Sequence, residues 1–154
     1  MINYSKQNIN QDDIDAVIEV LKSDFLTQGP KVPEFENALR DYCSVNYAKV
    51  VSNATAALHL AYLAIGLKKG DVVWTSPNTY VATANAALYC GAEVDFVDID
   101  ARTYNMSVSS LEAKLQQAKK DKKLPKLVVP VHFSGQSCEM KDIWKLSQEY
   151  GFKI

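Results

Sequence analysis

The chain lacks the features that mark secreted, membrane-spanning or nucleic-acid-binding proteins. Its three cysteines, Cys43, Cys90 and Cys138, are widely spaced and form no CxxC pair, so we expect reduced thiols and a cytoplasmic protein. Residues 1–13 are too polar for a signal peptide, and no apolar run could span a bilayer, so we expect no membrane association. The formal net charge of −1 at pH 7 argues against nucleic acid as a partner.

Two glycine-rich phosphate motifs are also missing, because neither GxxxxGK[ST] nor GxGxxG occurs. This excludes the commonest signatures of nucleotide-triphosphate and dinucleotide sites. The composition is otherwise ordinary, with 47% hydrophobic and 23% charged residues in 154 positions. A chain of this length and composition can form a globular domain with a substantial core.

Strands and helices alternate from about residue 48 onward. The pattern predicts strands at 48–52, 72–75, 93–97 and 126–131, and helices at 55–66, 80–90, 107–120 and 139–150. This alternation is typical of an α/β domain with a mostly parallel sheet flanked by helices.

Two further helices are predicted before this alternation. The first follows Asn10 and ends near Ser23, with an apolar face at Ile14, Val17, Ile18 and Leu21. The second begins near Pro33, after a loop that contains Gly29 and Pro30.

The turn at residues 52–56 is the first candidate site. A strand that enters a helix through small residues leaves backbone N–H groups unpaired, and such a helix start can bind a phosphate. The hydroxyls of Ser52 and Thr55 can add donors, and Ala54 and Ala56 let the backbone approach closely. The alternative is an ordinary strand-to-helix turn capped by Asn53 or Thr55.

The other strands end in polar segments at the same expected edge of the sheet. These segments are Thr75–Tyr80, Asp98–Asp100 and His132–Gln136. Ligands of open α/β sheets bind at the carboxyl ends of the strands. A phosphate seat, an aromatic side chain, acids and a histidine together favour an anionic aromatic cofactor.

Six stretches spread over nearly the whole chain resemble the DegT/DnrJ/EryC family of sugar aminotransferases, which use pyridoxal phosphate. They are residues 26–30 (LTQGP), 52–58 (SNATAAL), 70–73 (GDVV), 76–83 (SPNTYVAT), 96–100 (FVDID) and 130–135 (PVHFSG). The resemblance implies part of the large domain of the fold type I pyridoxal phosphate enzymes. It implies an N-terminal arm and helix at 1–30, and the N-terminal part of the cofactor-binding domain at 31–154.

The resemblance places the cofactor phosphate on Ala54, Thr55 and Ala56, in agreement with the reading of the turn. It also implies that Tyr80 stacks on the pyridine ring, where an aromatic face suits the cofactor. The alternative for Tyr80 is a plain core tyrosine.

For substrate binding, the resemblance implies Thr27, Gln28 and His132. The first two match a family loop near the active site at the dimer interface. For His132, a structural role is an equal alternative, and we expect His59 to be a helix-face residue rather than a ligand.

The reaction implied is amination of a UDP-linked 4-keto-6-deoxy N-acetyl hexosamine, as in pseudaminic acid biosynthesis, with glutamate as donor and a homodimer as the full-length form. The family's Schiff-base lysine and pyridine-nitrogen aspartate would follow Ile154, so we expect no catalytic residue within the chain and no activity from it alone. No metal is expected. Two alternatives remain, namely a non-catalytic α/β module that binds a phosphorylated small molecule, and a remnant that pairs with a full-length partner.

Overall fold

The computed structural model describes residues 5–154, which divide into one compact unit ending at Val50 and another spanning Val51–Ile154. The first unit contains the two predicted early helices, α1 (Gln11–Leu21) and α2 (Lys31–Cys43). Helix α1 begins with a capping box, in which Asn10 and Asp13 each accept a hydrogen bond from the other's backbone amide. No residue of α1 or α2 is buried against the described part of the chain.

The second unit is built on a parallel sheet, as predicted. Its strands are β1 (Val72–Thr75), β2 (Glu93–Phe96) and β3 (Leu127–Val129), in the spatial order β2-β1-β3. Val73 of β1 lies opposite Val94 on one side and Leu127 on the other. On the far side of β3, Lys153 forms a parallel bridge with Leu127.

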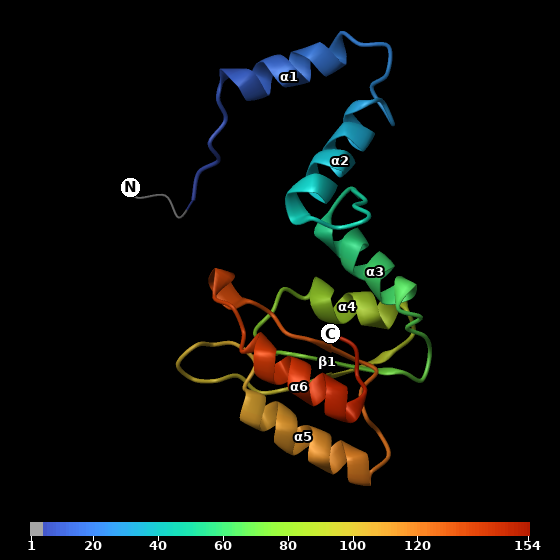
Figure 1. Ribbon diagram of the computed structural model, residues 1–154, viewed down its shortest axis with the longest axis vertical. Coiled ribbons are helices and arrows are strands. Elements are labelled where there is room, and N and C mark those ends of the chain that lie inside the picture. Colours follow the sequence, from blue (N-terminus) through green and yellow to red (C-terminus); the bar gives the residue numbers. More distant parts are fainter. Residues whose placement is uncertain (1–4) are drawn as a thin grey trace. The chain divides into compact units, whose positions relative to one another are not determined.

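Helices cover both faces of this sheet (Figure 1). Because successive side chains of a strand point to opposite faces, Val73 packs in the cluster of α3 (Ala54–Ala64) and α4 (Ala82–Tyr89). Trp74 packs in the cluster of α5 (Val108–Lys120) and α6 (Met140–Tyr150). The four predicted helices of this unit are confirmed, with bounds shifted by one or two residues.

The predicted strand at 48–52 is wrong, since no strand forms there. The Val50 amide donates instead to the carboxylate of Glu36 at 3.2 Å, and the Lys49 ammonium pairs with the same carboxylate at 2.7 Å. The β-branched residues of this segment have the right propensity for a strand. A strand also needs a neighbour to share its hydrogen bonds, and no strand among residues 5–154 pairs with this segment.

Candidate functional site

Helix α3 begins with free backbone donors. Asn53 has extended backbone angles (φ −166°, ψ 166°), and its Oδ1 accepts a hydrogen bond from the Ala56 amide at 2.9 Å. The amides of Ala54 and Thr55 and the Thr55 hydroxyl have no partner within the described part of the chain. Asn53 therefore caps the helix, as the alternative interpretation predicted, and two amides still remain for a ligand.

The same turn is open to solvent. Ser52, Asn53 and Ala54 are exposed, while Thr55 and Ala56 are half-buried. No packed side chain closes the turn, so an anion there would meet two backbone N–H groups, a hydroxyl and the positive end of the α3 dipole.

Tyr80 lies in the turn between β1 and α4. Its side chain is 75% exposed, so it is not the core tyrosine of the alternative interpretation. Its backbone is held in place, because the Tyr80 carbonyl accepts the Thr83 amide at 3.0 Å and the hydroxyls of Thr79 and Thr83 lie 2.8 Å apart. An anchored backbone with a free ring suits a side chain that stacks on a ligand.

Helices α3 and α4 are joined by a buried tyrosine. The Tyr62 hydroxyl donates to the Thr83 carbonyl oxygen at 3.0 Å, and Tyr62 is only 4% exposed. Burial, with a smaller contribution from the nearby Cys90, raises the pKa of Tyr62 to about 12. On the same helix, the His59 ring packs edge-on against Tyr89, with centroids 5.5 Å apart, as a helix-face residue would.

Exposed His132 follows β3 and precedes a short 3-10 helix, Phe133–Gly135. Its Nδ1 accepts a hydrogen bond from the Cys138 amide at 3.1 Å. Asn105, which sequence reasoning missed, is buried beside this segment and binds three of its backbone groups. No local pattern marks Asn105, because its partners lie 28 to 32 residues away.

The acids that follow β2 serve the local turn. Asp100 accepts hydrogen bonds from the amides of Arg102 and Thr103, and these bonds hold the pKa of its carboxyl below the usual range. Asp98 accepts from the adjacent Ile99 amide. Each carboxylate thus has a structural role.

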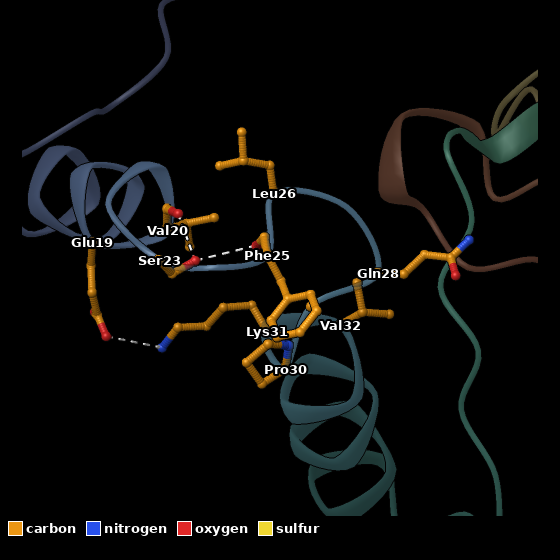
Figure 2. A pocket seen from close by; sticks show the side chains of 10 residues that line it. Glu19, Val20, Ser23, Phe25, Leu26, Gln28, Pro30, Lys31 and Val32 are labelled. Carbon is orange, nitrogen blue, oxygen red and sulfur yellow. Dashed lines mark hydrogen bonds and ion pairs between the residues drawn. The ribbon is translucent and has the colours of Figure 1, made fainter.

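Thr27 and Gln28 belong to the first unit, in the segment between α1 and α2. Gln28 lines a pocket formed by this segment and the ends of the two helices, and Figure 2 shows its side chain extending away from the Phe25 and Lys31 side chains. Gln28 has a left-handed backbone (φ 52°) and Thr27 is exposed. The other candidate residues belong to the second unit, so a shared site stays a prediction.

Among residues 5–154, no helix combines the length and the apolar character that a bilayer-spanning segment needs. Nor does any group of three or more histidine, cysteine, aspartate or glutamate side chains come together as metal ligands would in this part of the chain.

Comparison with known proteins decides the family. Residues 7–154 match the sequence profile of the DegT/DnrJ/EryC1/StrS aminotransferase family. The chain belongs to this family. The resemblance seen in the six sequence stretches is thus confirmed over nearly the whole length.

Curated members of the DegT family are similar to this chain throughout. The UDP-4-amino-4,6-dideoxy-N-acetyl-beta-L-altrosamine transaminase of Campylobacter jejuni (strain 81-176) is 47% identical over all of this chain, which covers 40% of that enzyme. The spore coat polysaccharide biosynthesis protein SpsC of Bacillus subtilis is 41% identical over 98% of this chain and 37% of its own length. The chain therefore spans about two-fifths of the length of these relatives.

Solved structures of the DegT family share the fold. Helicobacter pylori PseC, an aminotransferase involved in the biosynthesis of pseudoaminic acid, superposes with a TM-score of 0.86 at 32% identity, over 97% of this chain and 39% of PseC. The pyridoxal phosphate form of the putative sugar aminotransferase Spr1654 from Streptococcus pneumoniae has a TM-score of 0.85 at 27% identity, over 99% of this chain and 38% of Spr1654. The expected fold, part of a pyridoxal phosphate aminotransferase, is confirmed.

Proposed function

We propose that this protein acts as a pyridoxal phosphate-dependent aminotransferase of a nucleotide-linked keto sugar. The observation that carries the proposal is the family match over residues 7–154 together with the open, donor-bearing start of α3. The 47% identity to an altrosamine transaminase supports a UDP-linked 4-keto-6-deoxy N-acetyl hexosamine as substrate. We further propose glutamate as donor, a cytoplasmic location and a homodimer. Residues 1–30, of which 1–4 lie outside the described part of the chain, are proposed to form an arm, and 31–154 to belong to the cofactor-binding domain.

The residues at the start of α3 fit the cofactor's phosphate. Ala54 and Thr55 offer two amides and a hydroxyl that have no partner among residues 5–154, and the methyl group of the exposed Ala54 is too small to fill the space. The Ala56 amide is already held by Asn53, so Ala56 contributes room and helix dipole rather than a free donor. Of the three residues predicted to bind the phosphate, Ala56 is therefore not expected to donate its backbone amide to it.

When bound, pyridoxal phosphate supplies the electron sink that transamination requires. The chain's own residues would bind and orient it. Thr55 and the α3 amides would hold the anionic end, and the exposed Tyr80 ring would stack on the aromatic ring. His132, Thr27 and Gln28 are proposed to contact the sugar nucleotide.

Pyridoxamine phosphate tests the seat directly, because it forms no covalent bond with a lysine. In a calorimetric titration, we expect pyridoxamine phosphate to bind at least about tenfold more tightly than pyridoxamine, which lacks the phosphate. Thr55→Val should weaken pyridoxamine phosphate binding about tenfold and leave pyridoxamine unchanged. For Tyr80, the matched pair is Tyr80→Ala, which should weaken both ligands, and Tyr80→Phe, which should weaken neither.

Equal affinity for pyridoxamine phosphate and pyridoxamine would contradict the proposed seat. A second assay then addresses the reaction, by following 2-oxoglutarate formation from glutamate with the UDP-linked 4-keto sugar. Phosphate-dependent binding without any turnover by the protein in its full length would favour the non-catalytic binding module instead.

A further inference from the structure

A buried asparagine organises the segment that carries His132. Asn105 is 3% exposed. Its Nδ2 donates to the carbonyl oxygens of Gln136 and Ser137 at 3.0 and 3.1 Å, and its Oδ1 accepts the Phe133 amide at 2.9 Å. One amide group therefore uses both of its donor hydrogens and its acceptor on a single loop.

The backbone of this loop needs such support. Ser134 has a left-handed backbone with φ 51° and ψ 29°, and Gly135 follows with φ 82°. A non-glycine residue in this region is strained and persists where its surroundings determine the conformation. Tyr104, beside Asn105, adds a tilted ring contact to Phe133, with centroids 6.1 Å apart.

The far end of the loop is closed onto its beginning. The Cys138 thiol donates to the Val131 carbonyl at 3.2 Å, and the Cys138 amide donates to His132 Nδ1 at 3.1 Å. Burial raises the pKa of the Cys138 thiol, which keeps it in the protonated form that can donate. Residues 131–138 thus form a closed loop around the Asn105 side chain.

The closure sets the chemistry of His132. An imidazole nitrogen that accepts an N–H cannot itself carry a proton, so the neutral ring has its proton on Nε2. His132 is exposed at the carboxyl end of β3, where ligands of parallel sheets bind. The ring is therefore presented to a ligand as a hydrogen-bond donor, with a fixed tautomer.

We propose that Asn105 is a positioning residue. It holds the closed loop of residues 131–138 so that His132 offers its Nε2–H to an oxygen of the sugar nucleotide. That the acceptor is an oxygen of the sugar nucleotide rests on the proposed function. The fixed tautomer of His132 does not depend on the proposed function, because it follows from the contacts of Asn105 and Cys138 alone. Asn105 is buried and would act through its hydrogen bonds to this loop.

The tautomer can be measured in the wild-type protein without any ligand. Nitrogen-15 NMR of the imidazoles above the pH of histidine protonation should show His132 with its proton on Nε2, and His59, the other histidine, provides an internal comparison. Asn105→Ala should abolish the single tautomer of His132 and leave His59 unchanged. Ser147→Ala, which removes a buried hydroxyl bonded to the Trp144 carbonyl, is the control for general destabilisation and should leave both signals unchanged.

A mixed tautomer of His132 in the wild-type protein would overturn the positioning role, whether or not Asn105→Ala folds. The proposed contact between His132 and the sugar nucleotide is tested separately, by the kinetics of the full-length enzyme. Asn105→Ala and His132→Ala should each raise KM for the keto sugar about tenfold, and the double variant should be no worse than His132→Ala. A fixed tautomer with an unchanged KM, or with additive effects, would overturn the contact with the sugar and keep the positioning.

Discussion

At the residue scale, one side chain decides how many donors the start of α3 can offer. The first turn of a helix leaves its amides without partners inside the helix. Asn53 takes the amide of Ala56 and leaves those of Ala54 and Thr55, which is enough to hold the helix start and still bind an anion. Helix capping and the proposed phosphate binding would thus use different amides of one turn.

Removing this cap tests the division. Asn53→Ala should lower the free energy of unfolding by about 1 kcal/mol, because the Ala56 amide loses its partner. Asn53→Ser, which retains an oxygen acceptor, is the matched control and should cost much less. Urea unfolding of the three proteins measures the difference, and equal losses for both variants would refute the capping role.

At the element scale, the carboxyl edge of the sheet is assembled by side chains that join neighbouring elements. The Thr75 hydroxyl of β1 donates to the Val129 carbonyl of β3 at 2.9 Å. Tyr62 links α3 to the start of α4. At the opposite, amino edge of the sheet, Lys126 links the loop before β1 to the start of β3. Each link fixes the end of one element against the next, so the turns that bear the candidate residues inherit defined positions.

Tyr62→Phe isolates the link between α3 and α4. We expect a loss of about 1 kcal/mol in the free energy of unfolding, since one buried hydrogen bond disappears. Tyr89→Phe, at a residue that is 59% exposed, is the control and should cost almost nothing. Chemical denaturation at pH 7 distinguishes the two, and a neutral Tyr62→Phe would show that packing alone joins the helices.

The raised pKa of Tyr62 also has a consequence at high pH. The folded protein holds this proton up to a pKa of about 12, against the ordinary value of 10.0, so between these values the unfolded chain binds fewer protons. The free energy of unfolding should therefore fall as the pH rises from 10 towards 12. Tyrosinate absorbance should show a late step that Tyr62→Phe removes, and a single early transition would contradict the assignment.

The ion pair of Asp71 and Lys126 gives a prediction at low pH. The hydrogen bond from Lys126, at 2.8 Å, is the main reason that the pKa of Asp71 lies below its ordinary value of 3.8. Asp71→Asn should cost about 1 kcal/mol or less at pH 7, because the pair is partly exposed. With a lowered pKa, this advantage is present above the unfolded value of 3.8 and is lost as the pH falls through the folded value.

Urea unfolding at a series of pH values checks this dependence. The wild-type and Asp71→Asn curves should converge at acid pH. Asp24→Asn, at an exposed residue with no ion pair in the described part of the chain, should run parallel to the wild type throughout. A constant gap between wild type and Asp71→Asn would exclude the ion pair as its source.

At the scale of the whole molecule, the two units differ in how they are stabilised. The second unit has clusters on both faces of its sheet, with Leu111, Leu115 and Ile143 fully buried. The first unit has no buried residue in α1 or α2, and Leu21, Phe25 and Phe35 are more than half exposed. Hydrophobic burial therefore stabilises the second unit far more than the first.

Truncating one leucine in each unit measures this contrast. Leu111→Ala should destabilise the protein by about 2–5 kcal/mol, because it leaves a cavity between α5 and the sheet. Leu21→Ala, the matched control at a position that is 65% exposed, should cost about 0.5 kcal/mol or less. A loss of about 2 kcal/mol or more for Leu21→Ala in thermal unfolding would mean that Leu21 is buried in solution, and would contradict this contrast.

The sequence by itself determined the helices and the class of fold. The apolar spacing of α5 and α6, and the β-branched runs of β1 and β3, depend on neighbours within a few residues, and all appear where predicted. The family also followed from sequence, since six short stretches in a fixed order are specific together. The assignment of Thr55, Tyr80 and His132 to a ligand stays a prediction, which the open turn and the exposed ring support.

Only the tertiary structure decided which groups pair across long separations. Residues 48–52 have strand propensity and form no strand, because Glu36 takes the Val50 amide and no neighbouring strand is present among residues 5–154. Asn105 looks like any turn residue until the loop at 132–138 folds over it. Hydrogen bonds between distant segments depend on where the folded chain places its donors and acceptors. Local propensity depends on neighbouring residues only, so it does not predict these bonds.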